Sequence, residues 1–483
     1  MPSLNLEPLT YEDIPADRRP SLLQALVPVL GIVLFLGVGS GYLKLAPHGP
    51  LLWSIVLTGA VGTYWLGYSW DDLYEGLADS LLMGLQAILI LFVIYALIAT
   101  WISAGTIPGL MYYGLAVLTP DVFLPATALL AMAVAFAIGS SWTTAGTLGV
   151  AFIGIGAGLG VPEPMTAGAV LSGAYAGDKQ SPLSDTTNLA AAVTNVDLYD
   201  HIRAMRNGTV LAFGLSVLLY AVLGLRSGGA IPAGRVAEIQ GALAGTYDLS
   251  ALVLLPLVVT FGLALYGVSA LPTLVAGVFA GTFATILVQG RSFTAAWGVF
   301  LDGTAPETGV TLVNDLLASG GLSGSAWTIS IVVAALALGG LLERTGVLAV
   351  LAHSFASAVR GPRSLVIGTG ASAILVNAFS AQQYMSIVVP GLTLRNLYDE
   401  YGLAGEDLSR AIESAGTPTG ALFPWHAGAV YMSAVFGVGT LAYAPYYFFA
   451  FLSPLVLFAT TLLGGRNEGT AGSGRQSPAT TDD

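Results

Sequence analysis

The sequence predicts an all-α polytopic membrane protein with two inverted repeats, each containing a re-entrant hairpin and a discontinuous helix. Three observations lead to this prediction. The chain is 55% hydrophobic and only 9% charged, whereas soluble domains are about 25% charged. Apolar runs long enough to cross a bilayer recur, and the alternating strands of a membrane barrel are absent. Two kinds of polar interruption each occur twice. We therefore expect about 10 spans plus 2 hairpins.

The first repeat is expected over residues 21–225, after a cytoplasmic tail over 1–20. Its long apolar runs predict spans at about 21–39, 51–69, 80–102 and 208–225. A run at about 106–118 is too short to cross. Residues 124–159 are apolar but interrupted by Gly-Ser-Ser-Trp-Thr-Thr at 139–144. The two arms of about 15 residues predict a hairpin that enters the membrane and turns back.

A broken helix is expected next, over Ser172–Val193. Between its small apolar ends, residues 177–185 contain three charges, a Gly and Pro182. The proline lacks a backbone donor and restricts the residue before it, so a continuous helix is disfavoured. A charge at the bilayer centre costs about 2.5–3.5 kcal/mol, so charges at this depth indicate an ion-binding break. A polar loop between two short helices is the alternative.

The second repeat is expected over residues 250–463, after a loop containing Arg226 and Arg235. Apolar runs predict spans at about 250–267, 271–289, 326–342 and 442–463. The other expected elements are a polar segment at 302–315, a short helix at 346–359, a hairpin at 364–397 interrupted at 377–383, and a broken helix at 407–438 interrupted at 414–420. Residues 464–483 are predicted to form a disordered tail.

The interruptions repeat at a nearly constant offset. Ser141 and Ser380 are 239 residues apart, and Asp178 and Gly416 are 238 apart. Five crossings per half would invert the second copy. Arginine placement then favours cytoplasmic N- and C-termini, because more arginines fall inside than outside. The inside set is Arg18, Arg19, Arg203, Arg206, Arg344, Arg360, Arg363 and Arg466, and the outside set is Arg226, Arg235 and Arg291.

Four stretches resemble the motifs of the NhaC-type Na+/H+ antiporter family, within the ion-transporter superfamily. These are GDKQSPLSDTTNLA at 177–190, GSSWTTAGTLGVAF at 139–152, QQYMSIVVPG at 382–391 and ESAGTPTGALFPW at 413–425. The resemblance implies alternating-access exchange of cytoplasmic Na+ for external H+. Relatives exchange organic acids such as malate and lactate, so an organic-anion exchanger coupled to Na+ or H+ is the alternative. Gln382 stands where the family usually has Asp, and His426 where it has Asn.

In an antiporter, two cations compete for one binding site, and a carboxylate can bind either Na+ or a proton. Asp178 and Asp185 flank the break and are the candidates for Na+ binding and proton coupling. An N-cap role is the alternative for Asp185. Further oxygen ligands are expected from the break and the hairpin tips. They are Thr186, Thr187, Asn188, Ser140, Ser141, Thr143, Thr144, Asn377, Ser380, Gln382, Thr417 and Thr419. Each hydroxyl could instead bond a carbonyl of its own helix.

Three further ionisable residues have two interpretations each. Lys179 could couple protons beside Asp178 or form a static pair. Glu413 could be a proton group or a cap partner. His426 could sense pH or simply pack in the helix bundle.

Composition excludes several other classes of function. There is no cysteine, and the four histidines are widely spaced, so no thiolate or histidine metal site is expected. The net charge of −12 makes nucleic-acid binding improbable. No HExxH motif or nucleophile dyad suggests an enzyme. We expect no cofactor, Na+, H+ and the lipid bilayer as partners, a homodimer as one arrangement, and a place in the cell membrane. The acidic composition, with only two lysines, indicates a halophilic prokaryote.

Overall fold

The computed structural model describes residues 9, 11–43, 45–227, 234–357 and 359–463. Within these ranges the regular structure is helical, apart from one isolated antiparallel bridge between Thr304 and Ser319. The predicted C-terminal tail and most of the segment before Tyr11 lie outside the described residues. The protein is therefore all-α, as the sequence predicts.

Six helices of the described chain are long and apolar enough to cross a membrane. They are α1 continued by η1 (Leu22–Tyr42), α4 (Leu85–Ser103), α6 (Pro120–Ile138), α11 (Leu198–Ser227), α14 (Ala270–Leu287) and η5 continued by α17 (Leu322–Arg344). Two further pairs of helices are apolar enough but bent, Arg235–Thr246 with Ala251–Leu265 by 90° and Ala427–Phe436 with Thr440–Tyr446 by 85°. Counting each bent pair as one span raises the number to eight. The other predicted spans are divided. For example, the one expected at 51–69 is α2 (His48–Ala60) followed by the π-helical η2 (Val61–Trp65). The chain is a multi-pass membrane protein.

The remaining elements are shorter helices and connectors. They are α3 (Trp70–Met83), α5 (Thr106–Val117), α12 (Arg235–Thr246), η4 (Ala251–Leu254), α13 (Leu255–Leu265), α15 (Phe293–Asp302), α16 (Thr311–Leu316), α18 (Val347–Ser357), α23 (Thr440–Tyr443), η7 (Ala444–Tyr446) and α24 (Phe448–Leu463). Helix α5 and helix α18 occupy the two short apolar runs found in the sequence.

Both predicted hairpin turns are present, but their first arms are longer than expected. The first turn follows α6 at Gly139 (φ 74°) and continues into α7 (Ser141–Thr144), η3 (Ala145–Gly149) and α8 (Val150–Gly158). The second turn joins α19 (Pro362–Ser380) to α20 (Gln383–Glu400) at Ala381. Helices α6 and α19 have 19 residues each, whereas the predicted first arms cover residues 124–138 and 364–376. Each begins at a proline, whose fixed φ suits the first helical position.

Both predicted broken helices are also present. The first is α9 (Glu163–Asp178) followed by α10 (Asp185–Thr194), so its break is shorter than the predicted 177–185. The second is α21 (Gly405–Ala415), the 3-10 turn η6 (Thr417–Leu422) and α22 (Ala427–Phe436).

Helix α9 packs against α6 through glycines. A Cβ added at Gly173 would meet the backbone oxygen of Ala128, and one added at Gly177 would meet that of Met132. Close backbone approach through small residues is a common way to join helices in a membrane. The α9 contact therefore fixes the position of the first break.

Helix α12 lies in the region predicted as a loop. Ile239 and Leu243 on one of its faces are buried. Their spacing is that of a short amphipathic helix, which is too short to register as a span. The loop prediction was wrong here.

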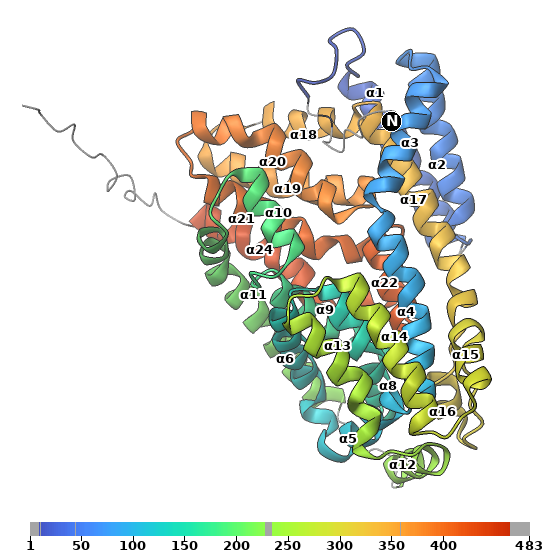
Figure 1. The fold of residues 1–483 in the computed structure, drawn as a ribbon. Coiled ribbons are helices and arrows are strands. Elements are labelled where there is room, and N and C mark those ends of the chain that lie inside the picture. The colour runs from blue at the N-terminus through green and yellow to red at the C-terminus, as the bar shows by residue number, and fades with distance from the viewer. Residues whose placement is uncertain (1–8, 10, 44, 228–233, 358, 464–483) are drawn as a thin grey trace, which may run out of the picture.

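The two ends of the molecule carry corresponding elements. Figure 1 shows α5 and α12 at one end, and α18 beside α1 and α3 at the other. Short helices at opposite ends are what inverted repeats would give. The inversion itself stays a prediction.

Candidate functional site

The first hairpin tip holds the carboxylate of Asp178. Gly139 turns the chain in a left-handed conformation, and the Ser140 side chain caps α7 by accepting from the Thr143 N–H. The backbone N–H and the hydroxyl of Ser141 then both donate to Asp178 Oδ2, at 3.0 and 2.7 Å. The side-chain atom Asp178 Oδ1 is buried and has no hydrogen-bond partner in the described chain. One oxygen is fixed, and the other remains for a ligand.

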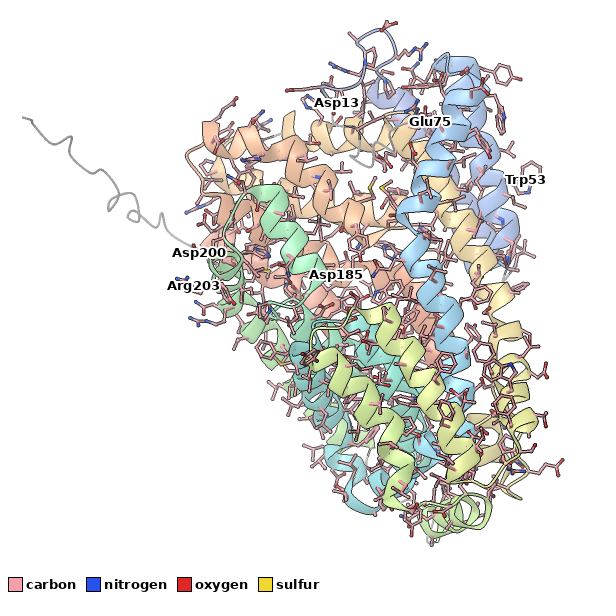
Figure 2. All side chains as sticks on the ribbon, viewed as in Figure 1. Asp13, Trp53, Glu75, Asp185, Asp200 and Arg203 are labelled. Carbon is pink, nitrogen blue, oxygen red and sulfur yellow. The ribbon has the colours of Figure 1, made fainter. Side chains whose placement is uncertain are left out.

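Asp185 is the first residue of α10, but it does not cap that helix. The cap is Ser184, whose side chain accepts from the Thr187 N–H. The Asp185 carboxylate instead accepts from the Thr186 N–H at 2.8 Å and from the Tyr384 hydroxyl at 2.6 Å. Figure 2 shows Asp185 at mid-height in the molecule, far from the end that carries Asp13. The N-cap interpretation of Asp185 is wrong, and its carboxylate is available at the cavity.

Asp178 and Asp185 line one cavity. An inner pocket of about 70 Å³ lies between the hairpin tips and the two breaks. It shares Asp185, Gln382 and Tyr384 with a wider, open cavity of about 1090 Å³. The polar and aromatic residues of the inner pocket are Gln86, Ser140, Ser141, Trp142, Asp178, Asp185, Thr186, Gln382, Gln383, Tyr384 and His426. The structure thus brings together the first break, the tip before α7, the tip before α20 and the start of α22.

The second hairpin tip holds the second break with neutral groups. Asn377 Nδ2 donates to the Gly416 carbonyl at 2.7 Å, and Asn377 Oδ1 lies 2.7 Å from His426 Nε2. The backbone N–H of Ala427 donates to the Ala381 carbonyl. Gln382 Nε2 donates to the carbonyl of Ser80 on α3. His426 also caps α22 by accepting from the Gly428 N–H, so it has a helix-packing role beside the cavity.

Several predicted oxygen ligands are occupied by local bonds instead. Asn188 donates to the carbonyls of Pro182 and Ser184, closing the first break. Ser380 Oγ donates to the Gln382 carbonyl, and Thr419 Oγ1 to that of Ala415. Thr144 bonds the carbonyl four residues earlier. The structure does not bring these side chains to the inner pocket.

Three predicted threonines keep a hydroxyl without a partner. Thr143 Oγ1 is unbonded in the described chain and faces a side cavity that Asp185 also lines. Thr187 Oγ1 and Thr417 Oγ1 are likewise buried and unbonded, away from the inner pocket.

Lys179 and Glu413 point away from the cavity. Lys179 Nζ donates to Ser453 Oγ on α24 at 3.3 Å and lies 5.6 Å from the ring centre of Phe449. Glu413 Oε1 accepts from the Thr186 hydroxyl at 3.2 Å. The adjacent residues Asp178 and Lys179 therefore send their charges to opposite sides of the first break.

Sequence reasoning missed Trp142, Tyr384 and His201. Trp142 and Tyr384 lie inside two of the motifs quoted above, one at each hairpin tip. An aromatic residue directly after a polar tip was the available signal. His201 had no local signal, because its buried partners come from distant α21.

Replacing Tyr384 with Phe should weaken substrate binding. The change removes the hydroxyl that holds the Asp185 carboxylate in place. The carboxylate must then be ordered when substrate binds, at a cost of about 0.5–1.5 kcal/mol, so KM should rise by up to about tenfold. Exchange rates measured in proteoliposomes over a range of substrate concentrations would show it. Tyr266→Phe, at an exposed position, is the matched control. An unchanged KM would show that the Tyr384–Asp185 contact does not serve binding.

Comparison with known proteins identifies the family. The Na+/H+ antiporter family matches residues 173–464. The chain is 54% identical to the arginine/ornithine antiporter ArcD of Halobacterium salinarum, over 94% of each chain. It is 37% identical to the Na+/H+ antiporter NhaC of Alkalihalophilus pseudofirmus, over 90% of this chain and 94% of that protein. It is 35% identical to a malate-2H+/Na+-lactate antiporter of Bacillus subtilis, over 90% and 93%. The chain therefore belongs to the Na+/H+ antiporter family, as its motifs had indicated.

Proposed function

We propose that this protein is a membrane antiporter that exchanges basic amino acids, arginine against ornithine. The observation that carries the proposal is the charge of the cavity. Asp178 and Asp185 are the charged side chains among the described residues that line the inner pocket, and Asp185 is the charged side chain among those that line the open cavity; both are acidic. A basic amino acid presents two cationic groups, which two carboxylates can hold. The 54% identity to an arginine/ornithine antiporter supports the same substrate class.

The cavity also offers a place for the substrate's α-carboxylate. Gln383 and Tyr384, which line it, are the first residues of α20. The first N–H groups of a helix have no partner within the helix, and they favour a bound anion. The α-carboxylate would therefore bind at the backbone N–H groups at the start of α20.

An aromatic wall suits a guanidinium or ammonium group. Trp142 lines the inner pocket and stacks on Tyr431 of α22, with ring centres 4.5 Å apart. Cations bind the faces of tryptophan rings with about 0.5–2 kcal/mol. The open cavity of about 1090 Å³ leaves room for an amino acid, which is far larger than Na+.

Exchange of cytoplasmic Na+ for external H+ is the second candidate. The family match and the NhaC relative favour it. The unbonded Oδ1 of Asp178 and the small inner pocket would suit a bare cation. In that case Asp178 and Asp185 would bind Na+ and H+ in turn.

Exchange of an organic anion such as malate or lactate has less support from the geometry. No lysine or arginine is among the described residues that line the inner pocket or the open cavity. Lys179, which follows Asp178 in the sequence, bonds Ser453 instead.

Transport in proteoliposomes distinguishes the candidates. We expect vesicles loaded with ornithine to take up radiolabelled arginine, and vesicles without ornithine to take up little. The same vesicles, with a pH-sensitive dye inside, would be given NaCl or malate. A Na+-driven pH change without arginine uptake would move the function to Na+/H+ exchange. A response to malate alone would contradict both arginine/ornithine exchange and Na+/H+ exchange.

A further inference from the structure

A side cavity lies next to the inner pocket. Its volume is about 270 Å³, compared with about 70 Å³ for the inner pocket. It is enclosed by the first hairpin tip, the first break, the end of α13 and the start of α14. Asp185 and Gln86 line the side cavity, the inner pocket and the open cavity alike. A molecule that enters from the open cavity therefore reaches both branches at Asp185.

Thr143 gives the side cavity an unused hydrogen-bonding group. This residue is 1% exposed, and its Oγ1 has no hydrogen-bond partner in the described chain. Thr273, which also lines the side cavity, donates to the carbonyl of Val268 at 3.1 Å. Buried hydroxyls are normally paired, so an unpaired one requires an explanation. A ligand in the side cavity would supply the partner that Thr143 lacks.

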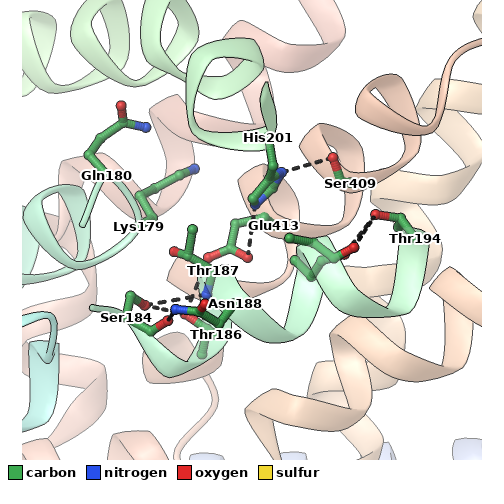
Figure 3. Close-up of polar contacts among 12 residues, drawn as sticks. Lys179, Gln180, Ser184, Thr186, Thr187, Asn188, Thr194, His201, Ser409 and Glu413 are labelled. Atoms are coloured by element: carbon green, nitrogen blue, oxygen red, sulfur yellow. Dashed lines mark hydrogen bonds and ion pairs between the residues drawn. The ribbon is translucent and has the colours of Figure 1, made fainter. Parts of the chain in front are cut away.

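Asp185 supplies the charge of the side cavity. It is the charged residue among the described residues that line this cavity. Its carboxylate accepts from the Thr186 N–H and the Tyr384 hydroxyl, and it keeps further lone pairs for a cation. Other polar side chains of the first break are already bonded. Asn188 donates to backbone carbonyls and Thr186 to Glu413 (Figure 3).

The remaining wall of the side cavity is largely apolar. Ile138, Leu183, Ala264 and Val268 contribute to it. A guanidinium group is planar and more weakly hydrated than an ammonium group, so leaving water for such a cavity costs it less. Its five N–H donors can also reach more than one acceptor at once. The cavity therefore suits a guanidinium group better than an ammonium group.

We propose that the side cavity holds the guanidinium end of arginine and that Thr143 distinguishes arginine from ornithine. This inference rests on the proposed exchange of these two amino acids. The side-chain nitrogen of ornithine corresponds to Nε of arginine, so ornithine lacks the terminal carbon and its two amino groups. Asp185, at the junction, binds the shared nitrogen in both substrates. Only arginine reaches past it to the Thr143 hydroxyl, while the α-amino end of either substrate stays beside Asp178.

Equilibrium binding of radiolabelled arginine and ornithine to the purified protein tests the proposal. Thr143→Val keeps the shape of the side chain and removes its hydroxyl. Kd for arginine should rise by about tenfold or more, because a hydrogen bond to a charged group is lost. Kd for ornithine should change by less than about twofold, and Thr143→Ser should restore arginine binding. Thr127→Val is the matched control, since its Oγ1 is also buried and unbonded in the described chain and Thr127 lines none of the three cavities.

A second variant fills the side cavity from the opposite wall. Ala264 is 5% exposed and lines the side cavity but not the inner pocket. Ala264→Leu should weaken arginine binding at least as much as Thr143→Val and leave ornithine binding in place. If this variant does not fold, the comparison of Thr143→Val with Thr143→Ser decides.

The outcomes separate this inference from the proposed function. If Thr143→Val changed both Kd values equally, or neither, the side cavity would not be the guanidinium subsite, while arginine/ornithine exchange would still stand. If the wild-type protein bound neither amino acid, both the proposed function and this inference would be overturned.

Discussion

Asp178→Asn is expected to slow exchange by about 100-fold or more, because it removes the one fully buried carboxylate of the cavity. An asparagine has nearly the same shape, and its oxygen can keep both bonds from Ser141. The negative charge that attracts the substrate is lost. A hydrogen bond to a charged group contributes about 1.5–3 kcal/mol, and about 1.4 kcal/mol corresponds to a factor of ten. The loss of electrostatic attraction between the Asp178 carboxylate and the substrate cation adds to this free-energy cost.

Initial rates of exchange in proteoliposomes, normalised to the amount of reconstituted protein, would measure the effect. Asp121→Asn is the matched control, since Asp121 is an exposed residue in the first turn of α6. That variant should exchange at the wild-type rate. If Asp178→Asn also exchanged within threefold of wild type, Asp178 would not be the substrate carboxylate, and Asp185 would have to act alone.

Gly173→Val is expected to prevent stable assembly of the helix bundle. Even a single Cβ at this position would meet the Ala128 backbone oxygen, and it would lie 2.8 Å from Ala131 Cβ. Backbone cannot rotate away as a side chain can, so α9 must separate from α6. Overpacking typically costs about 1–3 kcal/mol, and a rigid branched side chain against backbone belongs at the upper end or beyond. The first break would move with α9.

The temperature at which half of the detergent-solubilised protein remains monodisperse would report this change. Gly214→Val on α11 is the control, because nothing lies within 4 Å of a Cβ added there. It should leave the midpoint unchanged. Equal midpoints for both variants would show that the α6–α9 contact is more adaptable than its geometry indicates.

The breaks and turns of this fold were predictable because they have strong local causes. Pro182 and the charges around it mark the first break, and Gly139 followed by serines marks the first tip. The lengths of the helices were harder to predict from the sequence. The hairpin arms start at Pro120 and Pro362, a few residues before the predicted starts at 124 and 364.

The site was predictable only in its carboxylates. Asp178 and Asp185 follow from the motif around the break, and both line the cavity. The contacts that orient them come from other parts of the chain, such as Ser141 and Tyr384. Sequence alone names the residue types but not which of many serines and threonines turn inward. Asn188 and Thr419 turned out to bond backbone carbonyls.

The substrate was the least predictable feature. The motifs are those of a family whose members include Na+/H+, malate/lactate and arginine/ornithine antiporters. Relatives with each of these cargoes match the chain over at least 90% of its length, so overall similarity does not distinguish one cargo from another. The size and lining of the outer cavity carry that information, and they depend on the packing of several helices.

The two hairpin tips differ in backbone strain. The first turns at Gly139, which adopts a left-handed conformation freely, whereas the second turns at Ala381 with φ 58°. A left-handed alanine costs about 1 kcal/mol relative to glycine. Such strain persists only where the surrounding structure holds it. At the second tip the Ala381 carbonyl accepts from the Ala427 N–H at the start of α22. The second broken helix thus holds its hairpin against a backbone that would otherwise relax, a task that the first broken helix does not have.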